Sequence, residues 1–84
     1  MEKTLLVSQD YGHMTLHLKE QMEQRGISRN ELARSINVRF EVIDRWYRGH
    51  VEKLDLDILA RICFVLDCTP EVLLRYEAPV LENP

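Results

Sequence analysis

Residues 38–50, VRFEVIDRWYRGH, place three arginines among three aromatic residues. The arginines are Arg39, Arg45 and Arg48. A guanidinium group can form two parallel hydrogen bonds to a phosphate, or to the O6 and N7 atoms of guanine. The whole chain is acidic, with a net charge of -3, whereas residues 25–53 hold seven cations against four acids. The groups that could bind a polyanion are therefore gathered in the middle of the chain.

The length and composition indicate one globular domain. A chain of 84 residues has room for a single core, and 45% apolar with 30% charged residues is a globular composition. The apolar runs are far shorter than the roughly 20 residues that span a bilayer, and residues 1–15 lack the pattern of a secretory signal. Two cysteines are too few for a disulfide scaffold. We therefore expect a cytoplasmic protein without a membrane segment.

Two short helices joined by a tight turn must position the cationic segment. The sequence Ser28-Arg-Asn-Glu31 is a capping box that begins a helix over about residues 29–36, and Asn37 tolerates the left-handed conformation of a turn. A helix over about residues 40–48 follows and is stopped by Gly49. Apolar residues shared by the two helices are Leu32, Ala33, Ile36, Val38, Ile43 and Trp46. The lengths and spacing are those of a helix-turn-helix.

Three further helices are predicted around this pair. The first covers about residues 14–25, because Met14, Leu18 and Met22 are spaced by four and Gly26 can end it. Another covers about residues 56–66 after an Asp55 cap, with Leu56, Leu59, Ala60 and Cys63 on its apolar face and Ile62 and Leu66 widening that face. A short fifth helix is expected to begin at Thr69-Pro70. Residues 4–7 are β-prone but too few to establish a strand.

Residues 18–73 resemble the Cro/lambda-repressor-like (xenobiotic-response-element type) helix-turn-helix family of bacterial and phage transcriptional regulators. The resemblance rests on GISRNELARSINV, IDRWYRG and LDLDILARICFVLDCTPEVLL. It implies an all-α fold, a compact bundle of about five short helices, as in a lambda-repressor-like DNA-binding domain. It also implies sequence-specific binding of double-stranded DNA by a small transcriptional regulator, with the third helix in the major groove.

The expected division of the chain follows from this resemblance. Residues 1–13 are an N-terminal arm or a tag-like segment, residues 14–76 the helix-turn-helix DNA-binding domain, and residues 77–84 a C-terminal tail. Three positions depart from the family pattern. Arg29 stands where glutamine is usual, Arg39 where serine or threonine often caps the recognition helix, and Met22 with Tyr47 replace a common arginine–glutamate ion pair.

Candidate DNA contacts fall into two sets, and for each residue the alternative is a solvated surface side chain. The expected base contacts are Arg39, Phe40, Glu41 and Arg45, with Arg45 the first choice because it can bind guanine. The expected phosphate contacts are Arg29, Arg34, Arg48, His50 and Lys53. For Arg34 and Lys53, exposed ion pairs to Glu31 or Glu52 are equally plausible. Asp44 would repel phosphate unless Arg45, Arg48 or a base amino group neutralises it.

Other functions find little support among the residues. Trp46 is expected in the core, because it occupies an apolar helix position and base stacking is typical of single-stranded nucleic acid. His13 with His17, and Cys63 with Cys68, lack the spacing of a structural zinc site. No serine, cysteine or carboxylate has a base partner at a readable spacing, so we expect no enzyme, cofactor or small-molecule ligand.

The sequence leaves two questions about partners open. Leu73, Leu74 and Tyr76 could form a homodimer surface, or they could close the core of the monomer. The second question concerns function, because the net acidity and the acids Glu41 and Asp44 also fit a protein-interaction module. Such a module would use the helix-turn-helix as an antitoxin, adaptor or antirepressor.

Overall fold

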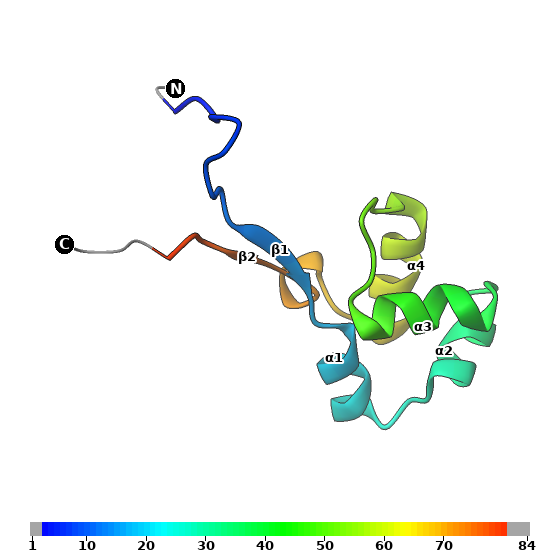
Figure 1. The fold of residues 1–84 in the computed structure, drawn as a ribbon. Helices are drawn as coiled ribbons and strands as arrows, with labels where there is room; N and C mark the ends of the chain where they lie inside the picture. Colours follow the sequence, from blue (N-terminus) through cyan, green and yellow to red (C-terminus); the bar gives the residue numbers. More distant parts are fainter. Residues whose placement is uncertain (1–2, 81–84) are drawn as a thin grey trace.

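The computed structural model describes residues 3–80 and contains four α-helices, one 3-10 turn and two β-strands. The helices form a bundle, and the two strands form a ribbon that projects from it (Figure 1). In chain order the elements are β1 (His13–Leu16), α1 (Leu18–Arg25), α2 (Arg29–Ser35), α3 (Phe40–Arg48), α4 (Leu56–Leu66), η1 (Pro70–Val72) and β2 (Leu74–Glu77).

The predicted helix-turn-helix is confirmed. The Ser28 hydroxyl accepts a hydrogen bond from the Glu31 amide at 3.1 Å, and the Glu31 carboxylate accepts from the Ser28 amide at 3.2 Å. After α2, Asn37 adopts a φ of 60°, and the Val38 amide donates to the Ala33 carbonyl. The buried Ala33 side chain is small enough for α3 to cross α2 closely. Local sequence signals therefore fix both helices and the turn between them.

The core is shared by all four helices and by the residue after the 3-10 turn. Its buried members are Leu18, Met22, Leu32, Ala33, Ile36, Ile43, Trp46, Leu59, Ile62, Leu66 and Leu73. Trp46 is therefore a core residue, as expected. Within residues 3–80, none of the helices is both long and apolar enough to cross a membrane.

The expectation of an all-α bundle of five helices was wrong. Residues 13–16 form β1, so the first helix begins at Leu18 and not near Met14. The expected fifth helix is a single 3-10 turn followed by β2, which pairs antiparallel with β1 in the register His13↔Glu77 to Leu16↔Leu74. Within each strand apolar and polar residues alternate, and alternation of this kind places the apolar side chains on one face of a sheet.

Both predicted ends of the domain shift as a result. The N-terminal boundary after residue 13 falls inside β1, and Glu77, assigned to the tail, is the last residue of β2. Residues 4–7 are not in a strand, and residues 81–84 of the predicted tail lie outside the described residues. On α4 the expected apolar face is buried at Leu59, Ile62 and Leu66, whereas Leu56 and Ala60, also expected on it, are exposed.

Candidate nucleic-acid interface

The buried residues of α3 determine which of its side chains form the outer, exposed face. Ile43 and Trp46 are buried, and this orientation leaves Glu41, Arg45 and Arg48 exposed at spacings of four and three residues. Side chains at these spacings lie on one face of a helix. Arg39, the exposed N-cap residue, stands at the start of α3, and Gly49 ends the helix with a φ of 78°. The predicted base readers Arg39, Glu41 and Arg45 therefore all belong to the exposed part of α3.

Asp44 is neutralised within the protein. One of its carboxylate oxygens accepts a hydrogen bond from Arg29 at 2.6 Å, and the other accepts from Arg48 at 3.0 Å. Partial burial acts to raise the pKa of the Asp44 carboxyl, but the bonds from Arg48 and Arg29 outweigh it and hold the pKa below its ordinary value. A carboxylate that would repel DNA is thereby paired with two of the expected phosphate-binding arginines.

Arg29 also lies over two aromatic rings of α3. Its guanidinium carbon is 4.7 Å from the centroid of the Tyr47 ring and 5.7 Å from that of Phe40. A guanidinium over an aromatic face is attracted by the ring quadrupole. The first residue of α2 is therefore held on α3 by three contacts, to Phe40, Asp44 and Tyr47. Phe40 faces this contact with part of its ring, which reduces the surface it can offer to a thymine methyl group.

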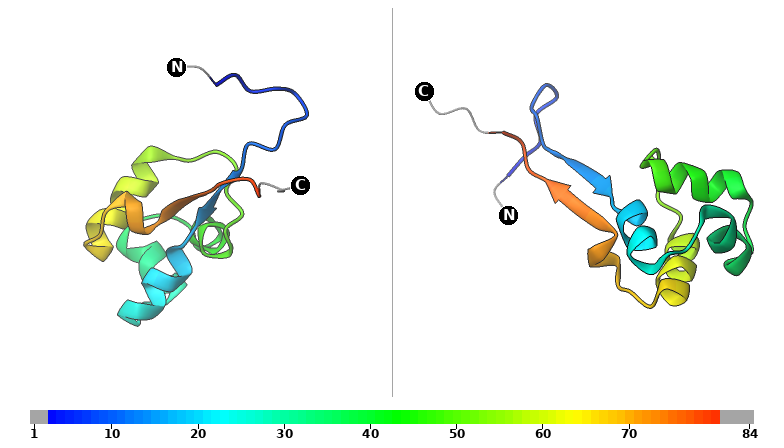
Figure 2. Two further views of the ribbon diagram at one scale, coloured as in Figure 1. Left: turned by 90° about the vertical axis from the view of Figure 1, so that its left-hand side faces the viewer. Right: turned by 90° about the horizontal axis from the view of Figure 1, so that it is seen from below.

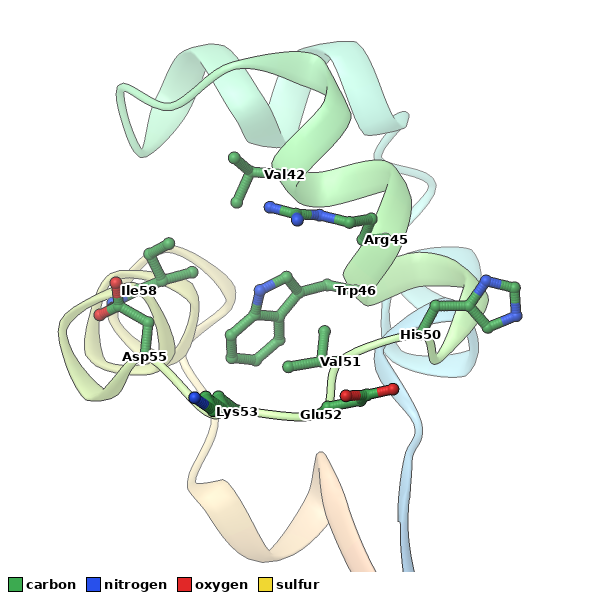
Figure 3. A pocket seen from close by; sticks show the side chains of 9 residues that line it. All are labelled: Val42, Arg45, Trp46, His50, Val51, Glu52, Lys53, Asp55 and Ile58. Atoms are coloured by element: carbon green, nitrogen blue, oxygen red, sulfur yellow. The ribbon is translucent and has the colours of Figure 1, made fainter.

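Arg45 differs from Arg29 and Arg48, which both form ion pairs with Asp44. Among residues 3–80, no carboxylate lies within 4.0 Å of its guanidinium nitrogens. It lines a pocket of about 430 Å³ between α3, the α3–α4 loop and the start of α4. In Figure 3 the guanidinium points from α3 across the mouth of this pocket towards Val42, above Trp46. The arginine in the middle of the outer face is thus available for an external ligand.

The loop between α3 and α4 adds two of the expected phosphate contacts to the lining of this pocket. His50 and Lys53 line the same pocket as Arg45, together with the acids Glu52 and Asp55 (Figure 3). The Asp55 carboxylate is engaged as the cap of α4, where it accepts from the Asp57 and Ile58 amides at 2.9 and 3.2 Å. His50 and Lys53 thus line the same pocket as Arg45, and their role as phosphate contacts stays a prediction.

Arg34 is the expected phosphate contact that this arrangement does not gather. It is exposed on α2, but it lies five positions after Arg29, which corresponds to about 140° around a helix. Its side chain therefore points to a different side of α2 from Arg29. A cation that the sequence reasoning missed is Lys19 on α1, whose Nζ lies 5.7 Å from the centroid of the Tyr47 ring. Lys19 lies one helix turn before Met22, and the resemblance places Met22 and Tyr47 at paired positions. This spacing was the sequence signal that Lys19 could lie near Tyr47.

Two further sets of residues lack the grouping of a reactive site. Across residues 3–80 no three histidine, cysteine or acidic side chains are gathered to hold a metal ion. Both ring nitrogens of His17 have partners, at 2.8 Å to the Thr15 hydroxyl and 2.9 Å to the Glu20 carboxylate.

Met22 and Tyr47, at the positions of the family's ion pair, instead contribute apolar surface to the core.

Comparisons with known proteins identify the domain. Residues 17–79, which are 63 of the 84 residues, match the family model of the Cro/C1-type HTH DNA-binding domain. The fold is similar to a structure reported as that of a DNA-binding protein from Bacteroides fragilis, with 21% identity, a TM-score of 0.67, and coverage of 75% of this chain and 100% of the other. It is also similar to the transcriptional regulator VanUg, with 16% identity, a TM-score of 0.66, and coverage of 90% and 100%.

No functionally curated protein matches the sequence significantly. At these identities the two solved structures establish the fold, and the family model establishes the kind of domain. Together with the helix-turn-helix geometry, they show that the chain belongs to the family of Cro/C1-type helix-turn-helix DNA-binding domains.

Proposed function

We propose that the protein is a transcriptional regulator that recognises a specific double-stranded DNA sequence by placing α3 in the major groove. The observation that carries the proposal is the state of Arg45, which is exposed in the middle of the outer face of α3 and has no carboxylate partner among residues 3–80. A guanidinium in that position can bind O6 and N7 of one guanine together. Arg45 is therefore the principal base reader of the proposal.

The neighbouring residues take the remaining roles on the reading face. Arg39 at the start of α3 can bind a second base edge, and the Glu41 carboxylate can accept from the N4 amino group of cytosine. The part of the Phe40 ring that Arg29 leaves free can contact a thymine methyl group. These residues precede Arg45 on α3, so they would read the bases on one side of its guanine.

Phosphate contacts flank this reading face. Arg29, Arg48, His50 and Lys53 lie around it, and Lys19 joins them through its place beside Tyr47. Such contacts supply affinity and fix orientation without reading sequence. Arg29 and Arg48 share the Asp44 carboxylate, so each offers DNA fewer free donors than an unpaired arginine would. Arg34 is the weakest member of the proposed set because it points to another side of α2.

Two copies would bind a symmetric operator. Helix-turn-helix dimers bind inverted half-sites whose centres are about one helical turn apart. We expect the same of this protein, with one α3 in each of two successive major grooves. Regulation would then depend on protein concentration as well as on operator sequence.

A protein-interaction module is the second candidate, and one observation favours it. Leu56, Ala60 and Phe64 form an exposed apolar row on α4, with Phe64 87% exposed. Large apolar side chains that remain exposed in a row are typical of surfaces that bind another protein. An antitoxin, adaptor or antirepressor would use this row in addition to α3 or in place of it.

Selection from a random duplex pool tests the proposal directly. The enriched sequence is then used in fluorescence anisotropy at two salt concentrations with the wild type, Arg45→Ala and Arg45→Lys. We expect Arg45→Ala to weaken binding about 10- to 100-fold, equivalent to 1–3 kcal/mol, and to relax the preference at one base pair. Arg45→Lys keeps the charge but not the planar pair of donors, so it should keep the salt dependence and lose most of that preference.

The two candidate functions predict different outcomes of this selection. Binding through several phosphates must weaken steeply with salt, whereas a mainly apolar protein interface should not. Failure to enrich any sequence at either salt concentration would refute the proposal and leave the interaction module.

A further inference from the structure

The turn at the end of α4 brings two cysteines together. The Cys68 amide donates to the Cys63 carbonyl at 3.0 Å, and the Asp67 amide donates to the Phe64 carbonyl at 3.4 Å. Asp67 is left-handed, with a φ of 51°. Two such bonds around a left-handed residue form a Schellman motif, in which the residue after the left-handed one lies against the residue five positions earlier. Cys63 and Cys68 occupy these two contacting positions.

The surroundings of the two thiols agree with this placement. Both cysteines are free and half-buried, and both pack against the core. Burial raises the pKa of the Cys63 thiol, and the neighbouring Cys68 and the Glu71 carboxylate raise that pKa further. Cys68 therefore lies close enough to influence the ionisation of Cys63. The two thiols face each other at a place that solvent can reach.

The backbone of the motif also satisfies the distance that a disulfide needs. Two cysteines can be bridged without backbone movement only when their Cα atoms lie within about 7 Å of each other. Here a hydrogen bond of 3.0 Å joins the Cys68 nitrogen to the Cys63 oxygen. One covalent bond connects that nitrogen to its Cα, and two connect the oxygen to its own Cα, so the Cα atoms are at most about 7 Å apart. A disulfide can therefore close on the existing turn.

We propose that Cys63 and Cys68 are a redox modification site, a dithiol that low-molecular-weight disulfides oxidise to an intramolecular disulfide. In reducing compartments such bonds are usually transient and serve as sensors. The bond would lock the left-handed turn at Asp67, where a residue other than glycine is energetically costly. Neither cysteine belongs to the reading face proposed for DNA, so the inference does not depend on the proposed function.

The reaction consists of two thiol–disulfide exchanges. First, the Cys68 thiolate attacks one sulfur of the external disulfide and forms a mixed disulfide, and the thiolate that leaves takes up the proton that Cys68 lost. We assign this step to Cys68 because the raised pKa of Cys63 keeps that thiol protonated at neutral pH. Cys63 then loses its proton to solvent, attacks the Cys68 sulfur and expels a second thiolate, which is protonated in turn. The protein gives up two hydrogen atoms, and the external disulfide is reduced to two thiols.

The cross-link would stiffen the passage from α4 to β2. Figure 2 shows the chain leaving α4 and passing through η1 into the strand. At the start of this passage the Leu66 carbonyl accepts from the Arg25 Nε at 2.8 Å, and at its end the Leu73 carbonyl accepts from the His17 amide at 2.7 Å. Leu73 is fully buried, so of the two roles expected from the sequence it closes the core and does not form a dimer surface. Both ends of the passage are held, and the cysteine turn lies between them.

Redox titration of the full chain tests the inference. The protein is equilibrated with mixtures of glutathione and glutathione disulfide, the remaining thiols are alkylated, and the intact mass is measured. We expect the wild type to lose both alkylation sites together, with no glutathione left on the chain. The equilibrium constant gives an effective thiol concentration. It should be about tenfold or more higher in the folded protein than in denaturant, because only the fold holds the two thiols together.

Single serine variants separate the two exchange steps. Cys63→Ser keeps the attacking thiol but lacks the second one, so it should stop at a mixed disulfide between Cys68 and glutathione. Cys68→Ser keeps only the thiol with the raised pKa and should react about tenfold more slowly. The two variants carry the same substitution and are controls for each other, and circular dichroism establishes that both are folded. Equal rates would contradict the assignment of the first attack to Cys68.

Amide hydrogen exchange locates the effect of oxidation in the chain. Exchange of the Cys68 amide should slow, because its hydrogen bond lies inside the closed turn. The strand β2 provides the control. The bond between the His17 amide and the Leu73 carbonyl sets the register, and bonded pairs alternate with non-bonded ones, so the Arg75 and Glu77 amides donate to β1. Their exchange should change less than that of Cys68.

Several results would overturn the inference. One is a wild type that keeps both thiols, or stops at a mixed disulfide, in an excess of glutathione disulfide. Another is a disulfide between two chains, seen as doubled mass on a non-reducing gel. A third is an effective thiol concentration that is the same in the folded protein and in denaturant. A protein that oxidises as expected but enriches no DNA sequence would refute only the proposed function.

Discussion

Arg29 and Asp44 link the first residue of α2 to the middle of α3 through a hydrogen bond of 2.6 Å. The same carboxylate receives Arg48 from the next turn of α3. One acid therefore sets the positions of two cations beside the proposed reading face, and it also cancels part of their charge. This arrangement would allow the helix that we propose to read DNA to tolerate a carboxylate.

Removing the charge of Asp44 should strengthen DNA binding in a non-specific way. In Asp44→Asn, Arg29 and Arg48 lose their ionic partner and are released for phosphates. We expect higher affinity at low salt for both selected and unrelated duplexes. The plot of log K against log salt concentration should steepen by about one unit for each additional phosphate contact. Anisotropy titrations over a salt series measure both quantities.

Asp57→Asn is the matched control for this experiment. Asp57 also forms an ion pair with an arginine four residues later, Arg61, at 2.8 Å, but on α4. Its removal changes the net charge equally without releasing Arg29 or Arg48. An equal steepening in both variants would assign the effect to net charge alone and contradict the role given to Asp44.

The stability of the fold should depend on pH through Asp44. Its folded-state pKa is depressed below 3.8 by Arg48 and Arg29 against the opposing effect of partial burial. A depressed carboxyl pKa means that the unfolded state binds more protons between the two pKa values. The stabilising contribution is therefore complete above the unfolded pKa and is lost as pH falls through the folded one.

Thermal unfolding of the wild type and Asp44→Asn from neutral pH down to about pH 2 tests this linkage. The wild type should have the higher melting temperature at neutral pH, and the difference should shrink as Asp44 becomes protonated. Glu20 and Glu31 also have lowered pKa values, from the bond to His17 and from the Ser28 backbone amide, but they are the same in both proteins. A difference that stays constant with pH would contradict the assignment.

The capping box of α2 makes a local contribution to stability. Ser28→Ala removes the acceptor of the Glu31 amide and should destabilise the protein by about 1 kcal/mol, which lowers the melting temperature by about 4–8 °C in a domain of this size. Ser35→Ala is the control at the other end of α2. The Ser35 hydroxyl donates only to the Glu31 carbonyl, so its loss should change stability by less than about 0.5 kcal/mol. Comparable losses in the two variants would show that the cap has no special effect.

Local signals were sufficient to predict the helix-turn-helix from sequence. The capping box, the Asn37 turn and the burial of Trp46 each depend on residues close in the chain. The pair between Asp44 and Arg48 also lies within one helix turn, where such pairs are expected. The pair with Arg29 spans fifteen residues and depends on how α3 crosses α2. Sequence alone could not choose Arg29 among the several cations of the segment.

The ribbon was missed because its evidence is non-local. Met14 has helical spacing with Leu18 and Met22, and only pairing with residues about sixty positions later makes residues 13–16 a strand. The alternation of Met14 and Leu16 with polar residues was a signal, but it is too short to outweigh the helical pattern. On α4 the expected apolar face was too wide, since Leu56 and Ala60 fit it by spacing but are exposed. Which apolar face is buried depends on the neighbouring elements.

The entry to the ribbon should be sensitive to one glycine. Gly12 has a φ of 82°, and a Cβ atom there would collide with the Glu77 carbonyl oxygen and the Tyr76 ring. Gly12→Ala should therefore separate β1 from β2 at this end and abolish the protection of the Arg75 and Glu77 amides. Gly26→Ala is the control, because Gly26 has a φ of 62° but nothing within 4 Å of the added atom. It should cost only the strain of a left-handed residue, about 1–2 kcal/mol, and leave the ribbon intact. Hydrogen exchange of both variants decides the matter, and protection of Glu77 that survives in Gly12→Ala would contradict the pairing of β1 with β2 at this end.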